Sequence, residues 1–275
     1  MRRIRRQRAG QQVRKQLMSM DSLDSRARPT ADEQGWAPAD FKLTMAFQPI
    51  VDMAEGTIFA HEALVRGPNG ESAAHVLSGV PADSQSRFDQ LCRRRAMELA
   101  ARLNISERIS INFQPLPENN LERGIIRTVK LADTFDLPLS QLLFEITDSH
   151  RTTSLDFVKE VIGAYQANGL ATALDNFGNG LVELNDLEMV APDIIKLDRE
   201  LTHNIDSNRV RQIFVKSVVD VCNEIDCRVI AQGVESQAEL ESLLSFGITH
   251  FQGYLLARPS LESVAELDND LPAGP

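Results

Sequence analysis

Short hydrophobic runs recur along the chain, and longer stretches with apolar residues at helical spacing separate them. Runs of four to eight apolar and β-branched residues are typical of strands, and an apolar residue every three to four positions is typical of an amphipathic helix. The predicted strands are residues 44–51, 58–66, 109–113, 142–146, 171–174, 194–197, 228–231 and 249–252. The predicted helices are residues 88–103, 119–135, 154–168, 184–190, 210–225 and 237–246, with a short helix beginning at Leu261.

The order of these elements predicts an α/β fold. Strands that alternate with helices favour a mostly parallel sheet covered by helices. The first two strands are joined only by a short connection centred on Glu55, so they should form an antiparallel hairpin. A TIM-like (β/α)8 barrel with one antiparallel strand satisfies both features. We therefore expect an arm and linker at residues 1–40, the barrel at 41–265 and a tail at 266–275.

Composition adds limits on the class of protein. The 275 residues are 43% hydrophobic and 25% charged, which is ordinary for a globular chain. No apolar run approaches the ~18–20 residues that cross a bilayer, so no membrane span is predicted. Cys92, Cys222 and Cys227 lack zinc-site spacing and suit a reducing compartment, so we expect a cytoplasmic protein.

Charge is distributed unevenly. The first twenty residues hold seven Arg and Lys and no acid, so the rest of the chain carries 22 basic against 39 acidic side chains. The basic arm could bind an anionic surface, or it could be a disordered tail or an over-extended start before Met18 or Met20. The acidic body argues against general nucleic-acid binding, because contacts to phosphate dominate that affinity.

Polar residues stand where successive predicted strands end. Glu62, Asn112, Glu145, Asp175 and Lys196 occupy such positions, and Asp198, Gln232 and Gln252 do so further along the chain. In α/β barrels the carboxyl ends of the strands form the mouth that carries the chemistry. Carboxylates gathered there would repel unless a cation lay between them, and oxygen ligands favour Mg²⁺, Mn²⁺ or Ca²⁺. The histidines are scattered, so the sequence predicts a hard-cation site rather than a zinc site.

An ordered series of motifs resembles the EAL domains, the cyclic-di-GMP phosphodiesterases of bacteria. It covers roughly residues 43–262, and one stretch, His61 to Gly70, looks most like EAL domains found with blue-light-sensing flavin domains. The motifs are Phe47-Gln48-Pro49-Ile50-Val51, Glu62-Ala63-Leu64-Val65-Arg66, Ser110-Ile111-Asn112, Phe144-Glu145-Ile146-Thr147, Asp175-Asn176-Phe177-Gly178, Ile195-Lys196-Leu197-Asp198, Ala231-Gln232-Gly233-Val234-Glu235 and Phe251-Gln252-Gly253-Tyr254-Leu255.

The resemblance implies roles for these residues. It implies a barrel that binds cyclic di-GMP across its mouth, where two Mg²⁺ or Mn²⁺ ions activate the water that opens one phosphodiester bond. The first ion would be held by Glu62, Asn112, Glu145 and Asp175. Lys196, Glu62, Asp175 and Glu235 would act in catalysis, with Lys196 orienting the water. The nucleotide would contact Gln48, Leu64, Arg66, Asn112, Asp198 and Gln252.

Two departures from the family pattern fall at the second ion. Active members carry two consecutive aspartates where this chain has Asp175-Asn176, and a glutamate where it has Gln232. Amide oxygens bring no negative charge, and hard cations depend on ligand charge, so the second ion should be weakened most. The segment after Gly178 also differs, and Asp148 replaces a common glutamate; in the family that segment couples dimerisation to the metal site.

These departures predict a degenerate EAL domain with little or no turnover. It would act as a cyclic-di-GMP receptor or as a module that binds a regulatory protein, and a homodimer stays open. The alternative is an active phosphodiesterase, slow or Mn²⁺-dependent, that hydrolyses cyclic di-GMP to the linear dinucleotide. A third hypothesis is that the same pocket acts on a different substrate.

Overall fold

The computed structural model describes residues 42–115, 120–147, 154–179, 182–265 and 267. The predicted arm at residues 1–40 lies outside the described residues, as do Asp148 and, apart from residue 267, the predicted tail. Within the described part of the chain, no helix combines the length and apolar composition needed to cross a bilayer.

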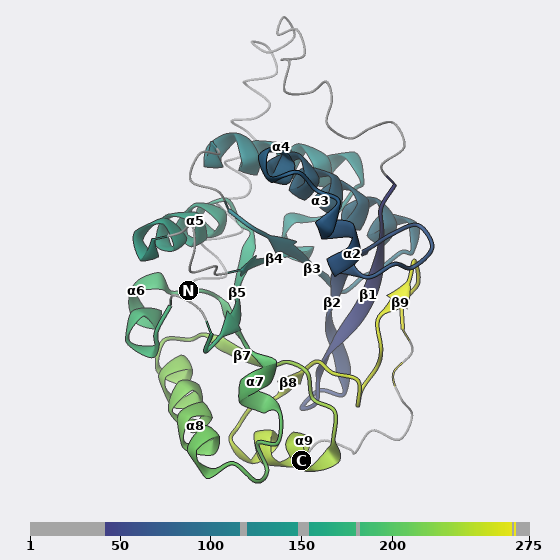
Figure 1. Ribbon diagram of the computed structural model, residues 1–275. Helices are drawn as coiled ribbons and strands as arrows, with labels where there is room; N and C mark the ends of the chain where they lie inside the picture. The colour runs from purple at the N-terminus through teal and green to yellow at the C-terminus, as the bar shows by residue number, and fades with distance from the viewer. Residues whose placement is uncertain (1–41, 116–119, 148–153, 180–181, 266, 268–275) are drawn as a thin grey trace, which may run out of the picture.

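Eight strands close into a barrel with one reversed member, which confirms the predicted fold (Figure 1). β1 pairs antiparallel with both β2 and β8, whereas neighbours from β2 to β8 pair in parallel. The strands are β1 (Thr44–Asp52), β2 (Thr57–Arg66), β3 (Arg108–Phe113), β4 (Leu142–Thr147), β5 (Ala171–Phe177), β6 (Ile194–Leu197), β7 (Arg228–Ala231) and β8 (His250–Phe251).

Helices cover the outside of the barrel, and α4, α5, α6 and α8 follow it from the top to the lower left of Figure 1. Several begin where the sequence supplies a cap: Asn120, Ser154, Asn208 and Ser236 each accept a hydrogen bond from a backbone N–H of the first turn. The helices are α2 (Ala73–Ser78), α3 (Gln85–Arg102), α4 (Leu121–Thr134), α5 (Leu155–Ala167), α6 (Leu187–Val190), α7 (Arg199–Thr202), α8 (Arg209–Glu224) and α9 (Gln237–Ser245), and 3₁₀ turns span Ala82–Ser84, Leu139–Gln141 and Leu184–Asp186.

The prediction of a short helix beginning at Leu261 is wrong. Ser260–Leu261 form a further strand, β9, which pairs antiparallel with Ala46 and Phe47 of β1. On β1, the pairing with β8 is limited to Val51 and Asp52, so the edge of β1 beside Ala46 is open to another partner. Backbone groups left unpaired at that edge would be costly, and β9 satisfies them. The short helices α2 and α7 were not predicted, because four to six residues carry too little periodicity.

Residues that point into the barrel form two layers. Ile50, Ala60, Leu143, Ala173, Ile194 and Ile230 make a buried apolar layer. Side chains alternate along a strand, so the residue two positions nearer the mouth faces the same interior. Those positions hold Gln48, Glu62, Glu145, Asp175, Lys196 and Gln232. The apolar layer therefore supports a polar layer at the mouth.

Acid should destabilise the fold partly through His250, which lies at the opposite end of the barrel. Burial and the nearby charge of Arg228 lower its pKa to about 4, although Asp52 acts in the opposite direction. The unfolded chain, with a pKa near 6.5, then binds more protons, so stability is complete above about pH 6.5 and falls as pH drops towards 4. We expect His250→Gln to remove about 1–2 kcal/mol of the loss between pH 7 and pH 5. Urea unfolding at both pH values measures this.

The matched control is His75→Gln, because His75 is exposed on α2. If His250→Gln and His75→Gln show the same loss between pH 7 and pH 5, burial of neutral His250 does not contribute to acid lability.

Candidate functional site

Lys196 lies at the centre of the polar layer. Its ammonium is fully buried and donates hydrogen bonds to Glu62 Oε2 at 2.8 Å and Glu145 Oε1 at 2.6 Å. Ser110 adds a hydroxyl donor to Glu145 Oε1 at 2.5 Å. A buried charge is tolerable only when it is paired and hydrogen-bonded, and here one ammonium compensates two carboxyl groups from β2 and β4.

The two glutamates respond to Lys196 differently. Burial alone would raise the pKa of Glu62, but the Lys196 charge and hydrogen bonds from Lys196, Gln252 and Asn112 lower it to about 2. Burial and the neighbouring Glu62 charge raise the pKa of Glu145 to about 8, against the opposite effect of Lys196. The pKa of Lys196 is raised because the carboxylates outweigh its burial. Glu62 is therefore the more acidic of the two glutamates around Lys196.

Asp175, at the mouth end of β5, is held by two amides. Gln232 Nε2 donates to its Oδ1 at 2.9 Å, and Asn176 Nδ2 donates to its Oδ2 at 2.8 Å. Burial raises the pKa of Asp175. Both carboxylate oxygens thus have hydrogen-bond partners, Asn176 and Gln232, which are the positions where the resemblance implies carboxylates.

A second group of hydrogen bonds joins the mouth ends of β8, β1 and β2. Gln252 Nε2 donates to Glu62 Oε2 at 2.7 Å and to Gln48 Oε1 at 3.3 Å, and Gln48 Nε2 donates to the Ala257 carbonyl at 3.0 Å. Asn112 Nδ2 donates to Glu62 Oε1 at 2.9 Å. The structure therefore brings Gln48, Glu62, Asn112 and Gln252 together with Lys196 and Glu145.

The other predicted residues lie at the edge of this cluster. Leu64 and Arg66 share the inward face of β2 with Glu62, both half-buried, and Arg66 donates to the Val65 carbonyl at 2.8 Å. Asp198 caps α7 through a hydrogen bond from Glu200 N at 2.6 Å. Glu235 forms an exposed ion pair with Arg199 at 2.9 Å instead of joining the cluster.

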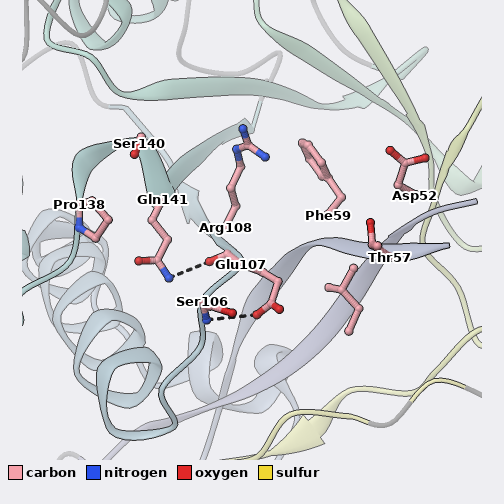
Figure 2. Close-up of a pocket in the computed structure, with 10 residues that line it drawn as sticks. Asp52, Thr57, Phe59, Ser106, Glu107, Arg108, Pro138, Ser140 and Gln141 are labelled. Carbon is pink, nitrogen blue, oxygen red and sulfur yellow. Dashed lines mark hydrogen bonds between the residues drawn. The ribbon is translucent and has the colours of Figure 1, made fainter. Parts of the chain in front are cut away.

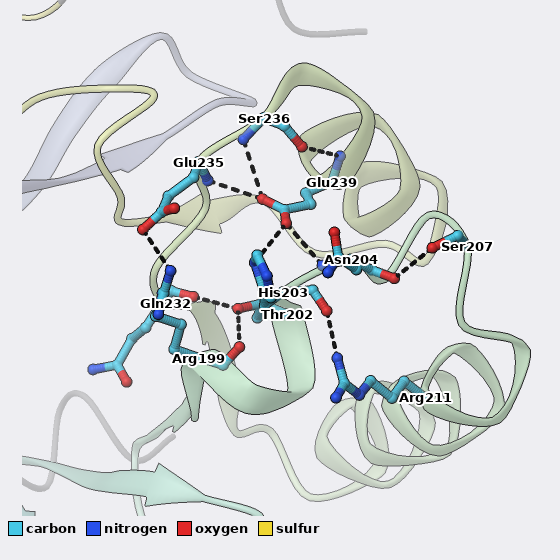
Figure 3. Close-up of polar contacts among 10 residues, drawn as sticks. All are labelled: Arg199, Thr202, His203, Asn204, Ser207, Arg211, Gln232, Glu235, Ser236 and Glu239. Carbon is cyan, nitrogen blue, oxygen red and sulfur yellow. Dashed lines mark hydrogen bonds and ion pairs between the residues drawn. The ribbon is translucent and has the colours of Figure 1, made fainter.

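The segment that carries Gln232 is fixed by residues that the sequence did not single out (Figure 3). Thr202 Oγ1 donates to the Gln232 carbonyl at 2.6 Å. Glu239 accepts hydrogen bonds from the backbone N–H groups of Glu235, Ser236 and Asn204 at 2.8–3.1 Å. The sequence did carry a signal for Glu239, the Ser-x-x-Glu capping box at the start of α9. It also carried one for Ser110, which lies two positions before Asn112 on the same strand and therefore faces the same interior.

By their chemistry, the residues proposed for the first ion suit a hard cation better than those proposed for the second. Glu62, Asn112, Glu145 and Asp175 offer oxygens, and the buried Glu145 Oε2 has no hydrogen-bond partner. In the described residues, however, no three His, Cys, Asp or Glu side chains are grouped closely enough to hold a metal ion by themselves. Amide donors satisfy Asp175 at the second site, where both amides would have to turn their oxygens towards a cation.

A hollow of about 370 Å³ opens at the opposite end of the barrel, where β1 ends and β2 and β3 begin (Figure 2). Asp52, Phe59 and Arg108 line it, and the Arg108 guanidinium lies 4.8 Å from the Phe59 ring centre. None of the predicted site residues lines this hollow. It is therefore separate from the polar layer.

Comparison with known proteins identifies the family. Residues 37–259 match the family model described as EAL domain. The chain is 30% identical over 224 residues to the blue light- and temperature-regulated antirepressor BluF of Escherichia coli (strain K12). This match covers 81% of the chain and 55% of BluF. It is 28% identical over 233 residues to the cyclic di-GMP phosphodiesterase PA2567 of Pseudomonas aeruginosa, and this match covers 81% of the chain and 39% of that protein. The chain thus spans about half or less of the length of these relatives.

Solved structures give the same result. A standalone versatile EAL protein from Vibrio cholerae O395, in a c-di-GMP-bound form, has a TM-score of 0.79 and 38% identity, and the match covers 85% of this chain and 98% of that one. BlrP1 of Klebsiella pneumoniae, in a manganese and cyclic-diGMP complex, has a TM-score of 0.77 and 31% identity over 85% of this chain and 60% of that one. These neighbours share the barrel observed here.

Proposed function

Because the chain belongs to the EAL domain family, we propose that it acts in bacterial cyclic-di-GMP signalling as a degenerate member with little or no phosphodiesterase activity. It binds cyclic di-GMP or a regulatory protein instead of turning the nucleotide over. The observation that carries this proposal is the pair of hydrogen bonds from Asn176 and Gln232 to Asp175. A carboxylate in the place of either amide would bring charge for a cation, whereas each amide satisfies Asp175 without one.

Retained contact residues support nucleotide binding. Gln48 and Gln252 are already positioned by hydrogen bonds to each other and to Glu62, and Arg66 offers a charge-assisted bond to phosphate. BlrP1 has also been solved with FMN and cyclic diGMP and no metal ions, so that relative holds the nucleotide without a cation. In this chain Leu64, Asn112 and Asp198 complete the proposed contact set.

One Mg²⁺ or Mn²⁺ ion fits the proposal. Glu62, Asn112, Glu145 and Asp175 would hold it, and its charge would favour the ionised form of Glu145, whose pKa is raised without it. BlrP1 has been solved with manganese or calcium together with cyclic diGMP. Such an ion would offset charge on the nucleotide phosphate, while Lys196 keeps Glu62 ionised.

A protein partner is the second version of the binding function. BluF is named an antirepressor, a name that describes action on another regulator, and it is 30% identical to this chain over 224 residues. We place this chain in the cytoplasm, because its three cysteines are free thiols that suit a reducing compartment. A homodimer is a further proposal from the resemblance, and residues 180–181 of the loop that it concerns lie outside the described part.

The competing function is a working phosphodiesterase. It is favoured by the retained first-site residues and by Lys196, which is hydrogen-bonded to Glu62 and Glu145. Catalysis would then use Lys196, Glu62, Asp175 and Glu235, with the amide oxygens of Asn176 and Gln232 serving a weak second ion.

A chromatographic assay separates the two functions. We expect purified protein with cyclic di-GMP and excess Mg²⁺ or Mn²⁺ to yield no linear dinucleotide over hours above the level of Glu62→Ala. Glu62→Ala removes a proposed metal ligand and so measures contaminating activity. Product that disappears with Glu62→Ala would sink the degenerate assignment and establish the competing function.

A further inference from the structure

An exposed aromatic residue stands at the mouth of the barrel, directly after the buried Gln252. Tyr254 is 51% exposed, and the Arg258 guanidinium lies 4.3 Å from the centre of its ring. Single exposed apolar residues are common on protein surfaces. Here, however, a cation covers one face of the ring, and the residue lies in a turn that leaves the carboxyl end of β8.

The turn is held firmly against the neighbouring strand end. Val234 N donates to the Gln252 carbonyl, and Leu255 N donates to the Val234 carbonyl, both at 3.1 Å. Gly253 permits this close approach, because a Cβ atom there would lie 2.0 Å from the Val234 carbonyl oxygen. Tyr254 therefore leaves the backbone from a position fixed by contacts with the segment that follows β7.

The same turn is joined to the proposed nucleotide contacts. The Ala257 carbonyl, one residue before Arg258, accepts a hydrogen bond from Gln48, and Gln252, two residues before Tyr254, donates to Gln48 and Glu62. Tyr254 and Arg258 thus lie on the same short segment as Gln252, and Ala257 between them accepts a hydrogen bond from Gln48. An aromatic ring backed by a guanidinium offers a flat surface of the kind on which nucleobases stack.

We propose that Tyr254, held by Arg258, is a stacking platform for one guanine base of the bound nucleotide. The base lies on the ring face that Arg258 does not cover, and Arg258 adds positive charge beside an acidic mouth. The inference rests on the proposed nucleotide binding and deepens it by assigning a base contact to a residue outside the predicted contact set.

Fluorine NMR tests the contact directly. The chain has two tyrosines, and Tyr165 is buried in the core, so 3-fluorotyrosine labelling gives one exposed reporter and one internal reference. We expect cyclic di-GMP to shift the Tyr254 resonance and to leave that of Tyr165 unchanged. Tyr254→Phe assigns the resonance and, because it keeps the ring, should bind the nucleotide with nearly unchanged affinity.

Calorimetric titration with cyclic di-GMP gives the energetic test. Loss of one base–aromatic stack should raise the dissociation constant of Tyr254→Ala about 5- to 150-fold. Phe214→Ala, which removes an exposed aromatic residue of α8, is the matched control and should bind normally. If the unchanged protein binds and Tyr254→Ala binds equally well, the platform is overturned and the proposed function stands. If the unchanged protein does not bind cyclic di-GMP, the proposed nucleotide binding and the platform both fail.

Discussion

Phosphodiesterase activity should rise by about a hundredfold or more when Asn176→Asp and Gln232→Glu are combined in one chain. The two amides now donate hydrogen bonds to Asp175, and the two new carboxylates would place negative charge at the same positions. A second divalent ion could then bind and stabilise the charge that develops on the phosphoryl oxygens, an effect of several kcal/mol at 1.36 kcal/mol per tenfold. Release of the linear dinucleotide in the presence of Mg²⁺ or Mn²⁺, followed by chromatography, measures the gain.

The control separates site chemistry from net charge. Asn223→Asp with Gln237→Glu makes the same change of charge on exposed positions of α8 and α9, and it should leave activity at the parental level. Each single site variant should gain less than the double variant, because the two carboxylates act on one ion. A double variant as inactive as its parent would show that loss of the second cation is not what prevents turnover, and that the pocket or the segment after Gly178 has also diverged.

Removing the buried ammonium should destabilise the metal-free protein strongly. Lys196→Met keeps a long side chain but leaves Glu62 and Glu145 without their shared cation. Breaking a buried pair by removing one partner costs about 3–5 kcal/mol, because the other charge stays buried. For a chain of this size, the melting temperature should fall by roughly 6–20 °C at pH 8. Thermal unfolding in a chelator measures the loss.

The same variant tests whether a cation can replace the lysine. We expect millimolar Mn²⁺ to recover part of the lost melting temperature in Lys196→Met, and to recover more there than it adds to the unchanged protein. Lys159→Met, on the exposed face of α5, is the matched substitution and should melt within a few degrees of the parent. If Lys196→Met melts like Lys159→Met, the ammonium does not compensate the two glutamates.

The sequence by itself determined the barrel and the place of its mouth. Strand and helix periodicities are local, so the eight strands were predicted to within three residues of their observed ends, the largest difference being at the end of β5. The short connection also predicted that β1 and β2 pair antiparallel. Parallel strands bring their carboxyl ends to one edge, which is why Glu62, Asn112, Glu145 and Lys196 could be placed together before any contact was known.

Only the tertiary structure decided how those side chains pair. Lys196 meets Glu62 across 134 positions of sequence and Glu145 across 51, and Gln232 meets Asp175 across 57. The sequence supplied carboxylates that a metal could satisfy, whereas in the fold they accept hydrogen bonds from one ammonium, one hydroxyl and four side-chain amides. Glu235 was placed with the site by its motif, yet the fold pairs it with Arg199 at the surface.

Long-range contacts also account for the remaining differences. Ser260–Leu261 becomes a strand because the edge of β1 near Ala46 needs a partner, which no local pattern around Leu261 can reveal. Thr202 and Glu239 act on the Gln232 segment from helices that precede and follow it. Hydrogen bonds and charge compensation depend on which groups share a low-dielectric space, and that neighbourhood exists only once the barrel has closed.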